Sequence, residues 1–414
     1  MRLPRMVRVN QEFPPRGLPD VALAVEQALA AARLDTAVRR GQRIAITAGS
    51  RGIANIALIV KAIVDAVKAA GGEPFIVPAM GSHGGATAEG QKELVGGYGI
   101  TEESMGAPIL SSMDTVLLAH TDEGIPCYMD RYAAEADGVI LCNRVKPHTD
   151  FKGPIESGLM KMLVIGLGKH VQAETIHSFG AGGLREHMPR VARRLLATGK
   201  VIGGLAIVED AYDQTAHVEW LSPSLMDQRE QGLLKTAAAE MARLPLDEID
   251  LLIVDRMGKN ISGTGMDTNV IGRLQIQGEA DPERPNIRYI LACSLTEASH
   301  GNALGIGLAD LTTQRLVDRI DYKVMNENVI TTSFIARGAV PLILPNDRIA
   351  VETALKCLWG VQPEDARVVR IVDTAHLAHI AVSEAALDSL PPYAKPVGTA
   401  EELSFDGYGN LLPL

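Results

Sequence analysis

The sequence has few cysteines and no long apolar run. Its four cysteines, Cys127, Cys142, Cys293 and Cys357, stand apart from one another, so no C-x-x-C pair indicates zinc, an iron–sulfur cluster or a dithiol switch. No apolar stretch approaches the roughly 18 residues that cross a bilayer, and the first residues lack the apolar segment of a secretory signal. These absences predict buried cysteines and a cytoplasmic protein.

Basic residues are outnumbered as well. Forty Lys and Arg residues stand against fifty Asp and Glu residues, which gives a net charge of -10. A field of this sign repels phosphate backbones and anionic lipid surfaces, so we expect neither nucleic acid nor a membrane as a partner. At about 150 residues per domain, the length of 414 residues predicts two or three domains.

Short runs that favour strands alternate with longer helical runs. Strands are predicted at 43–47, 74–79, 137–142, 201–209, 249–255, 288–294 and 340–345, and helices at 56–70 and 87–99. This alternation is typical of parallel sheets covered by helices. The fold class is therefore predicted to be α/β, with two domains that each hold a largely parallel sheet flanked by helices.

A domain boundary is predicted where a helical run ends and a new strand begins, around Leu244 and Pro245. The N-terminal domain then spans 1–245, and a C-terminal α/β domain spans 249–385. Residues 386–414 form an irregular, proline-containing tail, which we expect to return to the N-terminal domain.

Glycine-rich polar loops follow the first two predicted strands. In open α/β sheets ligands bind beyond the carboxyl ends of the strands, so both loops are candidate sites. Ser50 and Arg51 lie in the first loop, where backbone N–H groups and the guanidinium could hold a phosphate or a carboxylate. An ordinary tight turn explains this loop nearly as well. In the second loop His83 lies among glycines, which suits an imidazole that moves a proton at a ligand.

The region 143–178 has the highest density of reactive side chains. It holds three histidines and four lysines, namely His148, His170, His177, Lys146, Lys152, Lys161 and Lys169. On a helix over 169–178, His170, Glu174 and His177 share one face, which fits either a metal site or a solvated helix surface. Five other histidines are expected to be structural, namely His120, His187, His217, His376 and His379.

A third polar loop follows the strand predicted at 249–255. Lys259, Asp267 and Asn269 could contact the carboxylate and hydroxyl groups of a polyhydroxylated acid. A site built for hydrogen bonding discriminates strongly against substrates that lack the matching groups. A solvated loop fits the pattern equally well.

The order of the candidate residues resembles the lactate racemase family, whose members use a nickel-pincer nucleotide. The residues that carry the resemblance are Ser50-Arg51, Gly81-Ser82-His83, Pro147-His148, Lys161, Gly166 and His177. The resemblance implies that His177 is the nickel ligand and that Lys161 joins the cofactor. It also implies that Arg51, with Ser50 and Gly166, binds the rest of the cofactor.

The same resemblance implies a reaction and its partners. His83 and His148 would be the two acid–base residues of a racemase or epimerase of a 2-hydroxy acid, which works by reversible hydride transfer to the nickel-pincer nucleotide. The active site would lie in the cleft between the domains, and maturation proteins would supply the cofactor. Two alternatives stay open: a non-isomerising enzyme that acts on a hydroxy acid with the same cofactor, and a non-catalytic carrier of a nucleotide-like ligand.

Overall fold

The structure is a computed structural model and describes residues 2–414. It divides into two compact units. The first unit is Pro15–Met241, and the second unit consists of Met1–Pro14 and Ala242–Leu414. Among the described residues, no helix combines the length and the apolar character that a membrane span requires.

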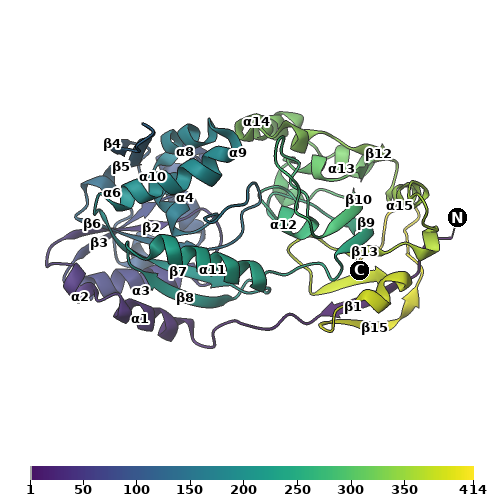
Figure 1. Cartoon of the computed structure of the whole chain (residues 1–414), viewed down its shortest axis with the longest axis horizontal. Helices are drawn as coiled ribbons and strands as arrows, with labels where there is room; N and C mark the ends of the chain where they lie inside the picture. Colours follow the sequence, from purple (N-terminus) through teal and green to yellow (C-terminus); the bar gives the residue numbers. More distant parts are fainter. Residues whose placement is uncertain (1) are drawn as a thin grey trace. The chain divides into compact units, whose positions relative to one another are not determined.

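The first unit is built on a five-stranded sheet with the order β3-β2-β6-β7-β8 (Figure 1). Its strands are β2 (Arg43–Ala48), β3 (Glu73–Pro78), β6 (Gly138–Arg144), β7 (Val201–Glu209) and β8 (Thr215–Leu221). All neighbours in this order run parallel except β8, which is antiparallel to β7. Because β3, β2 and β6 are parallel neighbours, the loops that follow them meet at one edge of the sheet.

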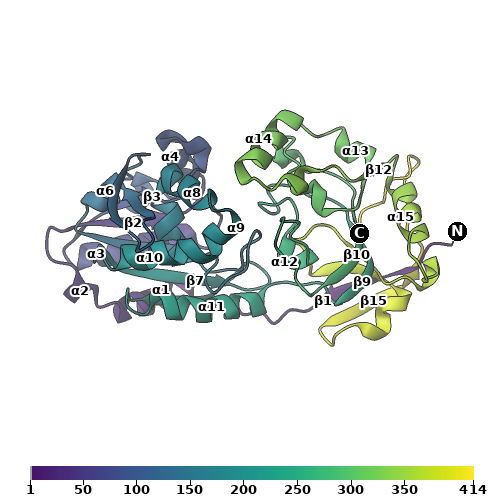
Figure 2. The same cartoon turned by 45° about the horizontal axis from the view of Figure 1, so that its top comes forward.

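Helices cover both faces of this sheet. Ile44 and Ile46 of β2 share one apolar cluster with α1 and α3, whereas Ala45 of the same strand belongs to a second cluster with α10 and α11. The two-residue period of a strand produces this separation. The helices are α1 (Val21–Ala31) and α3 (Ile56–Ala69) on one face, and α10 (Met188–Leu196) and α11 (Met226–Glu240) on the other (Figure 2).

Shorter elements complete the first unit. They are α2 (Leu34–Ala37), α4 (Ala88–Gly97), α5 (Glu102–Met105), β4 (Thr115–His120), β5 (Pro126–Asp130), α6 (Arg131–Glu135), α7 (Leu159–Lys161), α8 (Lys169–His177) and α9 (Gly180–Gly182). β4 and β5 form an antiparallel ribbon. Between α7 and α8 the chain widens into a π-helical turn at Met162–Gly166, a feature that occurs often at functional sites.

The second unit holds an eight-stranded sheet with the order β12-β11-β10-β9-β13-β14-β1-β15. Its strands are β1 (Met6–Gln11), β9 (Glu248–Val254), β10 (Asn286–Ala292), β11 (Leu311–Thr313), β12 (Leu342–Leu344), β13 (Val368–Ile371), β14 (His379–Ser383) and β15 (Ala394–Glu401). The strands from β12 to β13 run parallel, and β14, β1 and β15 are antiparallel to their neighbours. The helices are α12 (Thr268–Ile271), α13 (Gln314–Val317), α14 (Tyr322–Thr332) and α15 (Asp347–Lys356). The predicted α/β class, with largely parallel sheets flanked by helices, is confirmed.

The tail of the chain pairs with its first residues. The tail 386–414 was predicted to return to the N-terminal domain 1–245; β15 pairs with β1, whose residues lie within 1–245, and β1 pairs with β14 of the second unit. Further along the tail, the backbone N–H of Leu411 donates to the buried Asp347 at 2.8 Å. The first residues of the chain therefore belong to the second unit, because they fill the position between β14 and β15 in its sheet.

Candidate active site

Ser50 and His83 meet at the carboxyl edge of the first unit's sheet. Ser50 follows β2 and His83 follows β3, which is its neighbour in the sheet. The hydroxyl oxygen of Ser50 lies 2.5 Å from Nδ1 of His83. The hydroxyl group of Tyr98 donates to the Ser50 carbonyl at 2.7 Å and so holds the serine. The contact between Ser50 and Nδ1 orients the His83 ring.

His148 follows β6, on the other side of β2, and several groups hold it. The backbone N–H of Asp150 donates to Nδ1 of the His148 ring at 3.0 Å, and the backbone N–H of His148 donates to the carboxylate of Glu156 at 2.6 Å. The ring also packs on Phe151, with 4.7 Å between the ring centroids. Burial, followed by the charge of Lys161, lowers the pKa of His148 well below its usual value. The imidazole is therefore neutral at neutral pH.

Lys161 lies directly against His148. Its amino nitrogen Nζ is 2.5 Å from Nε2 of the His148 ring. Because Nδ1 accepts an amide proton, the proton of the neutral ring lies on Nε2. Nε2 can donate it to Lys161 only when the lysine is a neutral amine, a form that predominates above the pKa of the lysine. Burial lowers the pKa of Lys161 to about 8; Asp150 opposes this shift, and the charge of Arg51 adds to it. A neutral amine is the nucleophilic form of lysine.

A buried carboxyl group supports the helix that carries Lys161. Glu230 of α11 accepts the backbone N–H groups of Leu159 and Met160 at 2.6 and 3.1 Å. Burial raises the pKa of Glu230 to about 7. We did not predict this residue, although the sequence contains a signal for it: Glu230 is an acidic residue on the apolar stripe of α11.

The close packing of Glu230 against the chain leaves no room for a side chain at position 158, and the variant Gly158→Ala tests this. A Cβ atom at Gly158 would lie 2.5 Å from the carboxyl carbon of Glu230. We expect Gly158→Ala to lower the free energy of unfolding by about 1–3 kcal/mol, as overpacking does, in a urea titration. Gly232→Ala on α11 is the control, because a Cβ atom there meets nothing within 4 Å. A loss of stability no larger than that of the control would contradict the prediction.

His177, the predicted nickel ligand, ends α8. Although the residue is exposed, desolvation by surrounding atoms, followed by the charge of Lys161, lowers the pKa of His177. Its neutral imidazole is the form that binds metals. His170 and Glu174 on the same helix form an exposed pair at 3.9 Å. Across residues 2–414, no three His, Cys, Asp or Glu side chains gather into a metal-binding cluster, so the structure favours a solvated surface for His170 and Glu174.

Gly166 and Lys169 are both buried. The carbonyl of Gly166 accepts the N–H of Gly81 at 3.3 Å, and a Cβ atom at Gly166 would lie 2.8 Å from the carbonyl oxygen of Ala79. The structure thus gives Gly166 a packing role, and its contact with a cofactor stays a prediction. Lys169 is fully buried against Asp130, so its amine is not exposed to a ligand.

Lys259, Asp267 and Asn269 lie after β9 in the second unit. Lys259 donates to the carbonyl of Gly263 at 2.6 Å. Asp267 caps α12, and its carboxylate accepts the backbone N–H of Asn269 at 2.9 Å and the side-chain amide of Asn269 at 2.8 Å. These contacts stabilise the loop itself, and contact with a substrate stays a prediction.

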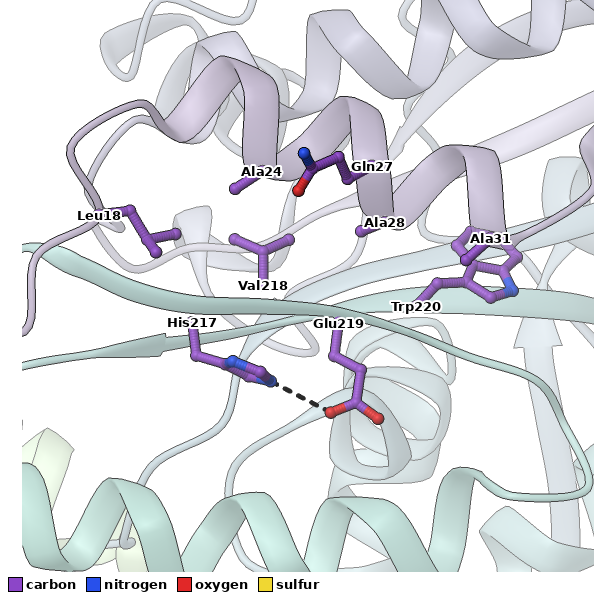
Figure 3. Close-up of a pocket in the computed structure, with 9 residues that line it drawn as sticks. All are labelled: Leu18, Ala24, Gln27, Ala28, Ala31, His217, Val218, Glu219 and Trp220. Carbon is purple, nitrogen blue, oxygen red and sulfur yellow. Dashed lines mark hydrogen bonds and ion pairs between the residues drawn. The ribbon is translucent and has the colours of Figure 1, made fainter.

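The first unit also contains a groove of about 480 Å³ between α1 and β8 (Figure 3). Small side chains of α1, among them Ala24 and Ala28, face Val218 of β8 across it. His217 contacts Glu219 at 3.1 Å, as expected of a structural histidine. The candidate site residues follow β2, β3 and β6 instead, so the groove is a separate feature.

Comparisons with known proteins concern the N-terminal part of the chain and the fold. Residues 5–183 match the family model described as the lactate racemase N-terminal domain. The lactate racemase apoprotein from Thermoanaerobacterium thermosaccharolyticum has a similar fold, with a TM-score of 0.55 at 12% identity over 89% of this chain and 98% of that chain. A threonine deaminase from T.th. is 13% identical over 89% of this chain and 79% of that chain, with a TM-score of only 0.15. No curated protein matches the sequence significantly.

Proposed function

Since residues 5–183 match the family model described as the lactate racemase N-terminal domain, we propose that the protein is an isomerase, a racemase or epimerase of a 2-hydroxy acid. The observation that carries this proposal is the pair of anchored histidines. His83 and His148 follow β3 and β6, the two strands that flank β2. Inversion of a carbon requires an acid–base group for each of its two configurations, and a pair of imidazoles meets this need.

The two histidines act on the hydroxyl proton of the substrate. A neutral imidazole takes this proton from one enantiomer, and the second imidazole, in its protonated form, gives a proton to the oxygen when the other enantiomer forms; proton exchange with the solvent then restores both rings. The low pKa of His148 keeps its ring neutral. Ser50 orients the ring of His83 through Nδ1. Both rings are thus held by the protein before a substrate arrives.

The residues of the first unit fit a nickel-pincer nucleotide by the chemistry of their donors. His177 would hold nickel through its neutral imidazole, Lys161 would join the cofactor through its neutral amine, and Arg51 with Ser50 would bind the phosphate. The chemistry supplied by the bound cofactor is the reversible acceptance of a hydride from the substrate carbon. Maturation proteins that supply the cofactor are part of this proposal.

The direct test is a stereochemical assay. The protein is purified from a host that makes the cofactor and is incubated with single enantiomers of several 2-hydroxy acids. We expect each acid that is a substrate to lose optical purity without a change of mass. Chiral chromatography measures the optical purity, and mass spectrometry measures the mass. A change of mass would indicate the non-isomerising alternative, and binding of the cofactor without turnover of any acid would indicate a carrier.

The amine of Lys161 offers a prediction that needs no cofactor. A small acylating reagent should modify Lys161 of the apoprotein with a rate that rises with pH and is half-maximal near pH 8, because the pKa of Lys161 is lowered to about 8. An ordinary lysine, with a pKa of about 10.4, reaches this point more than two pH units higher. Peptide mass spectrometry measures the rate.

A matched variant tests the cause of this low pKa. Arg51→Gln removes a positive charge that disfavours the ammonium form of Lys161, so the midpoint should move to higher pH. A midpoint near pH 10 in the unmodified protein, or an unchanged midpoint in Arg51→Gln, would contradict the assignment of the charges around Lys161.

A further inference from the structure

A buried ion pair lies beneath the loop that carries His83. Lys169 and Asp130 are both fully buried, with 3.3 Å between Nζ and a carboxylate oxygen of Asp130. Burial lowers the pKa of Lys169 and raises the pKa of Asp130, and the attraction between the two charges opposes both shifts. Taking two charges out of water is unfavourable, and only good geometry with further hydrogen bonds offsets it. The pair therefore needs a structural explanation.

Besides its ion pair with Asp130, Lys169 makes two hydrogen bonds. Its Nζ donates to the carbonyl of Pro78, the last residue of β3, and to Oε1 of Gln91 at 2.9 Å. Two hydrogen bonds and the ion pair with Asp130 thus surround the ammonium group with three oxygen partners. The backbone of Lys169 has a φ of 55°, a left-handed conformation that is unfavourable for a residue with a side chain. The fold holds Lys169 in this conformation, where its charge reaches the end of β3.

Gln91 transmits this anchoring to the His83 loop. Gln91 of α4 is fully buried. Its amide nitrogen Nε2 donates to the carbonyl of Gly81 at 2.8 Å and to the carbonyl of His83 at 3.2 Å. The oxygen of the Gln91 amide thus binds Lys169, and its nitrogen binds the loop on both sides of Ser82.

The loop needs such support because of its backbone. Gly81, Gly84, Gly85 and Ala86 all have positive φ values, between 53° and 66°. Glycines lose the most conformational freedom on ordering, so hydrogen bonds from a rigid side chain are effective here. Lys169 also begins α8, which ends at His177. The same contacts therefore connect the helix of His177 to the loop of His83.

We propose that Gln91, held by Lys169 and Asp130, is a positioning residue for His83. We refer to these three residues as the Gln91 clamp. The inference rests on the proposed function in one respect, the role of His83 as an acid–base group. The clamp does not touch a reacting atom; it fixes the backbone from which the imidazole reaches Ser50.

Amide hydrogen–deuterium exchange in the apoprotein tests the clamp. Gln91→Met keeps the size of the side chain and removes both donors, so exchange in residues 79–87 should become about ten- to a hundred-fold faster. Gln172→Met is the matched control. Gln172 is equally buried and accepts the backbone N–H of Tyr128 at 2.7 Å, in β5 rather than in the His83 loop. It should leave exchange in 79–87 unchanged.

A second variant keeps the test valid if Gln91→Met does not fold. Gln91→Glu keeps the acceptor for Lys169 but loses the donors to Gly81 and His83, so it should fold and still speed exchange in 79–87. Unchanged exchange in the Gln91 variants, or equal acceleration in Gln172→Met, would overturn the proposal.

Kinetics of the loaded enzyme give an independent readout. A positioning role predicts that Gln91→Glu lowers kcat and leaves KM unchanged, because the substrate still binds but the imidazole is displaced. A change confined to KM would overturn the positioning role. A wild-type holoenzyme that acts on no hydroxy acid would overturn the proposed function, whereas faster exchange confined to the Gln91 variants would still support the clamp.

Discussion

Replacing His148 with alanine is expected to lower kcat/KM of the holoenzyme by about two to four orders of magnitude, the usual contribution of a positioned acid–base group. The loss should be the same in both directions of the reaction. Two enantiomers have equal free energy, so the equilibrium constant between them is one. Because the ratio of the forward and reverse kcat/KM equals this constant, a variant must lower both values by the same factor. His83→Ala should show a loss of similar size. The measurement is the initial rate from each pure enantiomer.

Single turnovers separate the two histidines. If each imidazole serves one configuration, His148→Ala should still form the keto acid from one enantiomer in a single turnover, and His83→Ala should do so from the other. His170→Ala is the control, because His170 is an exposed histidine on α8 whose partner is Glu174, and it should retain full activity. Full activity in either site variant, or loss of the same enantiomer in both, would contradict the two-base assignment.

The strand ends of the site could be predicted from the sequence because local patterns determine them. β2, β3 and β6 each begin within one residue of the strands predicted at 43–47, 74–79 and 137–142. Apolar alternation and flanking glycines act over a few residues, so a single sequence contains that information. Ser50, His83 and His148 were placed correctly after these strands for the same reason.

The contacts between the strand ends could not be predicted in this way. Nζ of Lys161 meets the His148 ring and Ser50 meets His83 across 13 and 33 positions of sequence. Such contacts depend on strand order, which the local pattern does not contain. The pKa values of Lys161 and His148 follow from burial in the folded chain, so they were not accessible from the sequence either.

Long-range pairing also determines the structure of the termini. β15 is the edge strand of its sheet and pairs with β1, which lies between β14 and β15. Neither has the helix–strand rhythm of its neighbours, so composition alone favoured an irregular tail for 386–414. Gln91 and Lys169 show the same limit, because a polar residue in a sequence looks exposed until its buried partners are known.

The buried pair leads to the second large effect, on stability rather than rate. Lys169→Met should lower the free energy of unfolding of the apoprotein by about 3–5 kcal/mol, because it leaves the charge of Asp130 buried and uncompensated. The double variant Lys169→Met/Asp130→Asn removes both charges and should recover much of the loss. The exposed pair Lys61–Asp65 on α3 is the control, and Lys61→Met should cost less than about 1 kcal/mol. Urea titrations give the four values.

The pH dependence of Lys169→Met identifies the cause of its instability. Burial raises the pKa of Asp130, and Lys169 opposes that shift, so removal of the lysine should raise the pKa further. A carboxyl group whose pKa is higher in the folded than in the unfolded state binds a proton preferentially when folded, so lower pH favours folding. The stability deficit of Lys169→Met should therefore shrink as the pH falls through the folded-state pKa of Asp130, and the double variant should not show this change. A stability deficit that does not change with pH would mean that lost packing or hydrogen bonds destabilise the variant, and not the unpaired charge of Asp130.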